Sequence, residues 1–289
     1  MSATAPPWIL LRGLTRESRH WGNFPQQLGE AFPGAPVVCL DLPGNGKLNG
    51  LESPPSVEAM ADYCHAEIAK LGIAAPCRVL AMSLGAMVAV AWAQRHPNDV
   101  AAAVLVNTSL RPFSPFHRRL RPANYLRMLR LLGAKPSDRE LETAVLEMTT
   151  RLQQNPAATI DAWLQWRREN PVSRRNALRQ LLAAARYRAP RRRPLERLLL
   201  LASADDALVD ARCSQQLAAQ WNARIAVHAE AGHDLPLDDA AWVLAQIENW
   251  LDSFGDFARQ TPDLPCQGDA GKSRCTARSM SNIGLVQAP

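Results

Sequence analysis

Short apolar runs alternate with segments of helical periodicity along the first part of the chain. Residues 20–32 and 57–71 both carry apolar side chains at nearly helical spacing, and Ser56 stands at the N-cap position of the second segment. The runs that predict strands are Trp8–Arg12, Val37–Asp41, Arg78–Ala81 and Ala102–Asn107. This alternation predicts an α/β fold, with a mostly parallel sheet and helices on both of its faces.

The pattern changes between Leu110 and Pro194, where no segment predicts a strand. Several segments there predict helices instead, and Ser137 with Glu140 three residues later forms a capping-box pattern. The predicted helices are Tyr125–Leu132, Ser137–Gln153, Ile160–Glu169 and Ser173–Arg186. These features predict an inserted helical subdomain.

Strand signals resume at Leu198–Ala202 and Arg224–His228, and Asp239–Phe254 predicts a final helix. We therefore expect an α/β core of residues 1–109 and 195–258, interrupted by a helical cap of residues 110–194. Residues 259–289 are polar, contain glycine and proline, and show no periodicity, so they are predicted to form a disordered tail.

The composition is typical of a large globular protein whose cysteines are reduced. The chain has 289 residues, of which 47% are hydrophobic, which is enough for one α/β domain of roughly 250 residues. It lacks a run of 18 apolar residues, so no membrane span is expected, and its N-terminus lacks the features of a secretory signal. The six cysteines have no metal-ligand spacing. We expect a cytoplasmic protein with free thiols.

Positive charge is concentrated in the helical insertion. Between Arg111 and Arg193 there are 19 Lys or Arg residues and 6 Asp or Glu residues, whereas the whole chain carries a net charge of +6. The remainder of the chain is therefore acidic. The arginines are open to two main interpretations, a solvated helical face or a docking surface for an acidic partner such as an acyl carrier protein. Nucleic-acid binding is disfavoured because no recognised module accompanies the charge.

The predicted strand-to-helix turn at Ser83 carries the clearest chemical signal. A buried strand precedes this serine, a helix from about Ala86 follows it, and the small residues Ala81 and Gly85 flank the turn. A serine at such an apex exposes its hydroxyl, while the first amides of the helix point at whatever it attacks. The pattern predicts a nucleophilic serine, with an ordinary helix cap as the alternative.

Two later loops supply the partners that a nucleophilic serine needs. Asp205 and Asp206 lie in an acidic loop after the strand Leu198–Ala202, and His233 lies in a loop of small residues before the final helix. The imidazole would take the serine proton and return it to the leaving group, and a carboxylate would hold the imidazole in its working tautomer. No His, Cys or carboxylate cluster in the sequence suggests a metal, and the other five histidines are interpreted as structural.

From about Trp8 to Phe254 the chain resembles the α/β-hydrolase superfamily, in which the triad follows the order serine, acid, histidine. In length, helical insertion and spacing it is similar to the esterase that hydrolyses pimeloyl-carrier-protein methyl ester and to a lyase of menaquinone synthesis. The resemblance favours Asp206 over Asp205, because Ala-Leu-Val follows it. It also implies an oxyanion hole formed by the backbone amides of Leu84 and Leu14, in a loop where Arg12 replaces the family's usual histidine.

The resemblance further implies that the insertion covers the serine and selects the substrate. Aromatic residues of the cap that could line an acyl pocket are Trp163, Trp166, Tyr125 and Phe113, although helical spacing is equally typical of a cap core. We expect a serine esterase with a small-molecule substrate and no metal or organic cofactor. The alternatives are a carrier-protein ester or thioester hydrolase, a menaquinone-type lyase, and a non-catalytic binding protein on a hydrolase scaffold.

Overall fold

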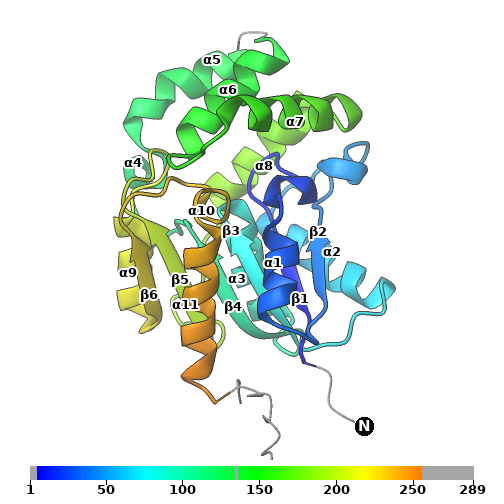
Figure 1. The fold of residues 1–289 in the computed structure, drawn as a ribbon, viewed down its shortest axis with the longest axis vertical. Helices are drawn as coiled ribbons and strands as arrows, with labels where there is room; N and C mark the ends of the chain where they lie inside the picture. The colour runs from blue at the N-terminus through cyan, green and yellow to red at the C-terminus, as the bar shows by residue number, and fades with distance from the viewer. Residues whose placement is uncertain (1–4, 134–135, 256–289) are drawn as a thin grey trace, which may run out of the picture.

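Six parallel strands form one sheet in the computed structural model, which describes residues 5–133 and 136–255. The sheet order is β2-β1-β3-β4-β5-β6. The strands are β1 (Trp8–Leu11), β2 (Val37–Leu40), β3 (Cys77–Met82), β4 (Val100–Val106), β5 (Leu198–Ser203) and β6 (Arg224–His228). The predicted parallel sheet is therefore confirmed (Figure 1). The predicted tail of residues 259–289 lies outside the described residues.

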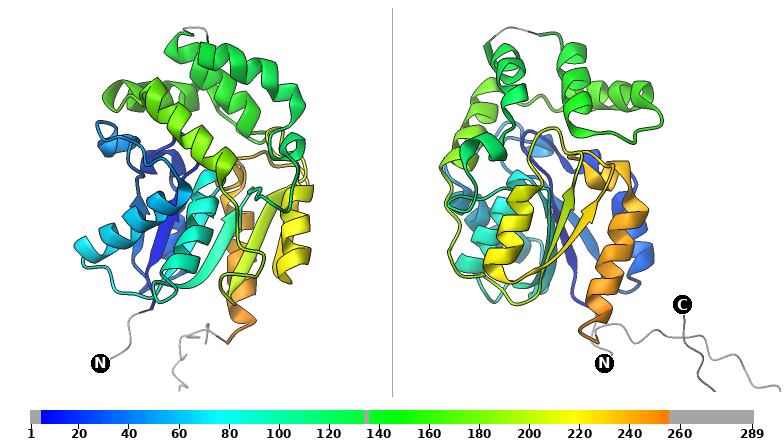
Figure 2. Two further views of the ribbon diagram at one scale, coloured as in Figure 1. Left: turned by 180° about the vertical axis from the view of Figure 1, so that it is seen from behind. Right: turned by 90° about the vertical axis from the view of Figure 1, so that its left-hand side faces the viewer.

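Both faces of the sheet are covered by helices, as the apolar strand runs predict. In β1, Ile9 and Leu11 pack into one apolar cluster, whereas Trp8 and Leu10 pack into the other. Figure 2 shows the two helical layers on either side of the sheet. The first cluster is completed by α2 (Val57–Lys70), α3 (Leu84–Arg95) and α9 (Arg212–Trp221), and the second by α1 (Phe24–Ala31) and α11 (Ala240–Asp252).

Two core helices, α2 and α11, begin within one residue of the prediction, whereas α1 begins at Phe24 rather than at His20, and α3 begins at Leu84 rather than at Ala86. The Ser56 side chain accepts a hydrogen bond from the Ala59 amide at 3.2 Å and so caps α2. The sequence analysis did not predict α9, whose buried residues Cys213, Leu217 and Trp221 recur every four positions. It also did not predict the short α10 (Leu235–Asp238).

A group of helices lies between β4 and β5 in the chain and above the carboxyl ends of the strands (Figure 1). It comprises α4 (Phe116–Arg119), α5 (Tyr125–Gly133), α6 (Asp138–Thr149), α7 (Pro156–Glu169) and α8 (Arg174–Arg186). Ser137 and Glu140 form the predicted capping box of α6. We call this group the cap, although its separation as a domain with boundaries at 110 and 194 stays a prediction.

Two cap helices differ in extent from the prediction. α6 ends at Thr149 rather than at Gln153, because Thr150 has extended dihedral angles. α7 begins at Pro156 rather than at Ile160, since the Asn155 side chain caps the Ala158 amide at 3.1 Å. Short 3-10 helices cover Ser18–Trp21, Gly46–Leu48 and Pro122–Asn124. Within the described part of the chain, no helix is both long and apolar enough to span a bilayer.

Candidate functional site

Ser83 occupies a sharp turn between β3, which ends at Met82, and α3, which begins at Leu84. Its φ of 54° and ψ of −114° are unusual for a residue with a side chain, and such strain is typical of functional positions. The turn is fixed by a hydrogen bond from the Ser83 amide to the Val106 carbonyl at 3.0 Å. Ser83 is partly exposed, whereas Met82 and Leu84 are buried. The backbone thus presents the hydroxyl at the carboxyl end of a central strand.

Close packing behind the turn explains the small residues around it. A Cβ atom on Gly85 would lie 2.5 Å from the Leu11 carbonyl oxygen and 2.6 Å from that of Arg12, so this position requires glycine. A Cβ atom on Gly13 would lie 3.3 Å from the Ser83 Cβ. The loop after β1 therefore runs directly beside the serine. Ala81 is fully buried in β3, opposite Leu11, where its methyl group fits.

The two residues whose amides are expected to form an oxyanion hole, Leu84 and Leu14, lie close to Ser83 along the chain or in space. Leu84 is the first residue of α3, so its N–H has no acceptor within the helix. Leu14 follows Gly13, which lies next to Ser83. The contribution of both amides to oxyanion binding stays a prediction.

The loops after β5 and β6 bring Asp206 and His233 together. His233 Nδ1 lies 2.7 Å from Asp206 Oδ2, and the two side chains are 3% and 1% exposed. Asp206 Oδ1 accepts hydrogen bonds from the amides of Leu208 at 2.7 Å and Val209 at 2.9 Å. The carboxylate is thus held by its own loop, and its second oxygen orients the imidazole. Asp205, by contrast, is exposed and pairs with Arg151 at 3.1 Å.

Asn107, which the sequence analysis missed, links the strands that carry these groups. It follows β4 directly, and because Met82 pairs with Val106, it lies beside Ser83 at the end of the sheet. Its Nδ2 donates to the His233 carbonyl at 2.8 Å, and its Oδ1 accepts from the Ser203 amide at 2.8 Å. These partners are 96 and 126 residues away along the chain, so no local sequence signal marks Asn107. The histidine loop is in this way anchored close to the serine turn.

Arg12 forms a buried ion pair with Asp234, the residue after His233. Its two terminal nitrogens lie 3.0 and 2.5 Å from the two carboxylate oxygens, and both side chains are 3% exposed. The guanidinium also lies 4.7 Å from the centre of the Trp21 ring. The arginine that replaces the usual histidine therefore connects the loop after β1 to the histidine loop by a bidentate contact.

The end of α6 packs on the histidine loop from above. The Asp234 amide donates to the Thr149 carbonyl at 2.6 Å, and a Cβ atom on Gly232 would lie 2.7 Å from that same oxygen. Asp238 accepts hydrogen bonds from the Gly232 amide at 2.7 Å and the Arg151 amide at 2.9 Å. Burial raises the pKa of Asp238 above its ordinary value. The glycine before His233 is thus needed for the cap to sit close to the imidazole.

A second contact between core and cap involves charged residues after β1. Arg16 Nη1 lies 2.7 Å from Glu142 of α6 and 3.0 Å from Nε2 of His20. Burial, followed by the nearby Arg16 and Arg12 charges, lowers the pKa of His20 well below its ordinary value. A cavity of about 20 Å³, enough for one water molecule, lies among these residues and Trp166. The imidazole of His20 is therefore neutral in the folded protein near neutral pH.

The four aromatic residues expected to bind substrate have different surroundings. Trp163 is buried in a small cap cluster, and its ring lies 4.3 Å from the Arg16 guanidinium. Trp166 lines the cavity described above. The Tyr125 ring lies tilted against that of Phe116 with the ring centres 5.7 Å apart, and the Phe113 ring meets Trp221 of α9 edge-on at 5.6 Å. The part of each residue in substrate binding stays a prediction.

Many cap arginines have acidic partners within the chain. Arg175 and Arg179, for example, both pair with Glu52 of the core. Further pairs are Arg127–Glu147, Arg139–Asp161, Arg151–Asp205 and Arg167–Asp138. Part of the cap's positive charge is thus balanced by carboxylates on its own surface or on the neighbouring core.

The sequence profile described as the Alpha/beta hydrolase family matches residues 8–246, which include the whole sheet and the cap. The chain belongs to the alpha/beta hydrolase family. None of the curated proteins matches the sequence. This alpha/beta hydrolase nevertheless shares its fold with many solved structures, and the finer resemblance to the pimeloyl ester esterase stays a prediction.

Three solved structures illustrate the shared fold. A bacterial membrane phospholipase A has 21% identity, a TM-score of 0.72 and coverage of 89% of this chain and 81% of its own. An esterase from Rhodococcus sp. ECU1013 has 19% identity, a TM-score of 0.69 and coverage of 86% and 91%. A thermophilic esterase from Thermogutta terrifontis has 20% identity, a TM-score of 0.65 and coverage of 86% and 90%. At these identities the likeness concerns the fold of the alpha/beta hydrolase alone.

Proposed function

We propose that this alpha/beta hydrolase cleaves carboxylic esters through an acyl-enzyme on Ser83. The observation that carries the proposal is the buried 2.7 Å contact between His233 and Asp206 at the edge of the sheet where the Ser83 turn lies. The three residues follow strands β3, β5 and β6. Because the carboxyl ends of parallel strands meet at one edge, residues far apart in sequence converge there.

In the proposed reaction, the Ser83 hydroxyl attacks the ester carbonyl while the free nitrogen of His233, Nε2, accepts its proton. The Asp206 carboxylate holds Nδ1 of the ring protonated and stabilises the imidazolium that forms. The imidazolium then gives the proton to the leaving alcohol, and the acyl group remains on Ser83. Water, deprotonated by His233, attacks this acyl-enzyme and releases the carboxylic acid.

The tetrahedral intermediates carry a negative charge on the former carbonyl oxygen. We assign its stabilisation to the amides of Leu84 and Leu14, because one begins a helix and the other follows the glycine beside the serine. Loss of one such donor typically costs about 10²–10³ in kcat. The proposed chemistry requires neither a metal nor an organic cofactor.

The activities named for structural relatives agree with this proposal. Two of the similar solved structures are described as esterases and one as a phospholipase A. The carrier-protein ester or thioester hydrolase and the menaquinone-type lyase use the same residues and stay alternatives. A cytoplasmic location, an acyl carrier protein as partner and the absence of nucleic-acid or membrane partners also stay predictions.

Turnover of p-nitrophenyl esters of increasing acyl length tests the proposal. We expect the protein to hydrolyse short-to-medium acyl esters, and Ser83→Ala to reduce kcat by at least about 10³-fold because the nucleophile is lost. Ser253→Ala serves as the matched control and should leave turnover unchanged, because this exposed serine lies at the end of α11 and its hydroxyl bonds only to the Trp250 carbonyl among the described residues. Full turnover by Ser83→Ala would overturn the assignment, and a folded wild-type protein without turnover would favour the binding-protein alternative.

A further inference from the structure

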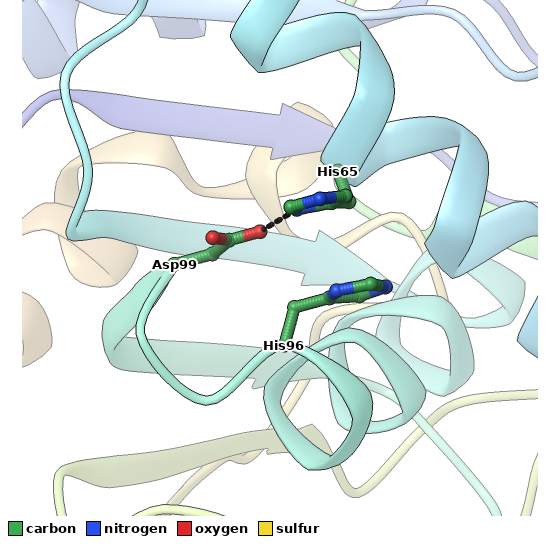
Figure 3. A group of neighbouring side chains, drawn as sticks. All are labelled: His65, His96 and Asp99. Carbon is green, nitrogen blue, oxygen red and sulfur yellow. Dashed lines mark hydrogen bonds and ion pairs between the residues drawn. The ribbon is translucent and has the colours of Figure 1, made fainter.

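Two histidines and an aspartate gather at the opposite end of α3 from Ser83. His65 lies on α2, His96 is the C-cap residue of α3, and Asp99 lies just before β4. Figure 3 shows the two imidazole rings face to face, with the Asp99 carboxylate beside them. One donor atom from each residue lies within 4.8 Å of the other two. Such a group of two nitrogens and one oxygen has the chemistry of a metal-ligand set.

Hydrogen bonds from neighbouring residues orient this group. His65 Nδ1 lies 2.7 Å from Asp99 Oδ2, and the Trp92 indole donates to the same oxygen at 2.7 Å. The other oxygen of Asp99, Oδ1, has no hydrogen-bond partner among the residues that the structure describes. It is therefore available to a cation.

A second carboxylate fixes the other ring. His96 Nε2 lies 2.9 Å from Asp62 Oδ1, and Arg95 holds Asp62 through contacts of 2.7 and 2.8 Å. Carboxylates that hydrogen-bond a ligating imidazole are a common outer layer of metal sites, because they set the tautomer and the ring orientation.

We propose that His65, His96 and Asp99 bind a divalent transition-metal ion such as zinc, at a site separate from the hydrolase residues. Two imidazole nitrogens and one carboxylate oxygen favour zinc and its transition-metal neighbours, whereas magnesium and calcium prefer oxygen ligands throughout. Three protein ligands leave a fourth position of a tetrahedral zinc ion for water.

One ring must leave the present arrangement to hold the ion, because the His65 and His96 rings are stacked nearly parallel with their centres 3.9 Å apart, and their lone pairs do not converge on one point. Ligand atoms around one tetrahedral zinc ion lie about 3.4 Å apart, given metal–ligand distances near 2.1 Å. The widest separation of the three donor atoms must therefore shorten from at most 4.8 Å. The His65 side chain is 45% exposed, so it can rotate toward the other two ligands without displacing core residues.

The site is remote from the proposed chemistry. The 12 residues of α3 separate Ser83 from His96, a length of about 18 Å for an α-helix. A bound ion would join α2 to the connection between α3 and β4 without touching the substrate. It would therefore raise the stability of the folded protein by linkage and leave ester turnover unchanged.

Calorimetric titration of the full-length, chelator-treated protein with zinc chloride near neutral pH tests the proposal. We expect one zinc ion per chain, a higher melting temperature with zinc, and no heat from magnesium chloride. His65→Gln and His96→Gln should each weaken zinc binding by at least about tenfold. His117→Gln, which removes an exposed histidine of the cap, is the matched control and should bind like the wild type.

A further readout separates this site from the hydrolase residues. Ester turnover should be the same for His65→Gln and the wild type. The result of the zinc titration does not depend on whether Ser83 is the nucleophile. Absence of zinc binding by the wild type, or unchanged binding by the His65→Gln, His96→Gln double variant, would overturn the proposal.

Discussion

At the scale of single residues, the two adjacent aspartates of the β5 loop have opposite surroundings. Asp206 is buried and contacts His233 at 2.7 Å, whereas Asp205 is exposed and pairs with Arg151. The sequence left these two aspartates as candidates for the acidic residue of the triad. The resemblance to the α/β-hydrolase superfamily favoured Asp206. A local pattern alone cannot decide between them, because the choice depends on which side chain the turn directs toward a loop 27 residues away.

Asp206→Asn tests this distinction. We expect kcat to fall by about 10³–10⁴-fold, because an amide in place of the carboxylate favours the wrong tautomer of His233 and cannot stabilise the imidazolium. Asp205→Asn is the matched control, and its kcat should stay within about twofold of the wild type, since an exposed ion pair contributes little. Both are measured with the same p-nitrophenyl ester. The reverse ranking of the two variants would identify Asp205 as the acid.

His20 gives the stability of the folded protein a defined pH dependence. Burial, with the charges of Arg16 and Arg12, lowers its pKa well below the ordinary value in the folded state. Below about pH 6.5 the unfolded chain therefore binds a proton at this residue that the folded protein does not, so stability falls as the pH falls. The contribution approaches about 1.4 kcal/mol per pH unit for one proton.

Urea denaturation between about pH 7.5 and pH 5 measures this effect. His20→Gln should flatten the loss of unfolding free energy on acidification, because it removes the group that titrates in the unfolded chain. His117→Gln should leave the slope unchanged, since His117 is exposed. An identical slope for His20→Gln and the wild type would contradict the assignment.

At the scale of elements, the sequence predicted every strand and most helices, because each combines a clear periodicity with a recognisable boundary. The sequence did not predict α9, because its ten residues bury few large apolar side chains. Its buried positions can be recognised only once the position of the sheet is known. α6 ends early because the Thr149 carbonyl accepts a hydrogen bond from the Asp234 amide, a contact with a distant loop. Helix ends set by such tertiary contacts leave no local sequence signal.

The contacts between loops at the site could not be predicted from the sequence either. Arg12 was recognised only as a departure from the usual histidine of its family, although it forms a buried bidentate pair with Asp234. The partners are 222 residues apart, so neither position predicts the other. Together with Asn107, this pair fixes the loop that carries His233.

Arg12→Met tests the strength of this connection. Removal of the guanidinium leaves the buried Asp234 carboxylate unpaired, so we expect a loss of about 3–5 kcal/mol in the free energy of unfolding. The Arg12→Met, Asp234→Leu double variant removes both charges and should recover much of that loss. Urea denaturation of the single and double variants measures both effects. A loss below about 1 kcal/mol for Arg12→Met would show that the pair does not hold the loop.

At the scale of the whole molecule, the cap and the proposed hydrolase residues lie at one end of the fold, and the proposed metal site lies at the other. The cap, with its surplus of arginine, lies above the carboxyl edge of the sheet (Figure 1). Ser83, Asp206 and His233 follow strands β3, β5 and β6 and so lie at this same edge. The histidine pair proposed to bind zinc lies at the other end of α3. The order of Ser83, Asp206 and His233 along the chain allowed the sequence to locate them. His65 on α2 and His96 at the C-cap of α3, by contrast, meet only because α2 packs against α3.

Salt dependence distinguishes a docking surface from a solvated face on the cap. If an acidic carrier protein binds there, turnover of a carrier-bound ester should fall steeply between low and high ionic strength, because salt screens the attraction between exposed charges. Turnover of a small p-nitrophenyl ester should barely change. Equal responses of the two substrates would contradict carrier docking and support the solvated face.

Labelling with a fluorophosphonate, followed by mass spectrometric mapping of the modified peptide, tests the central claim most directly. The proposed mechanism predicts one adduct, on Ser83, in the wild-type protein. It also predicts no adduct in Ser83→Ala and a strongly slowed reaction in His233→Ala, since the imidazole activates the hydroxyl. An adduct on another residue, or a folded wild-type protein that does not react, would contradict the assignment of Ser83 as the nucleophile.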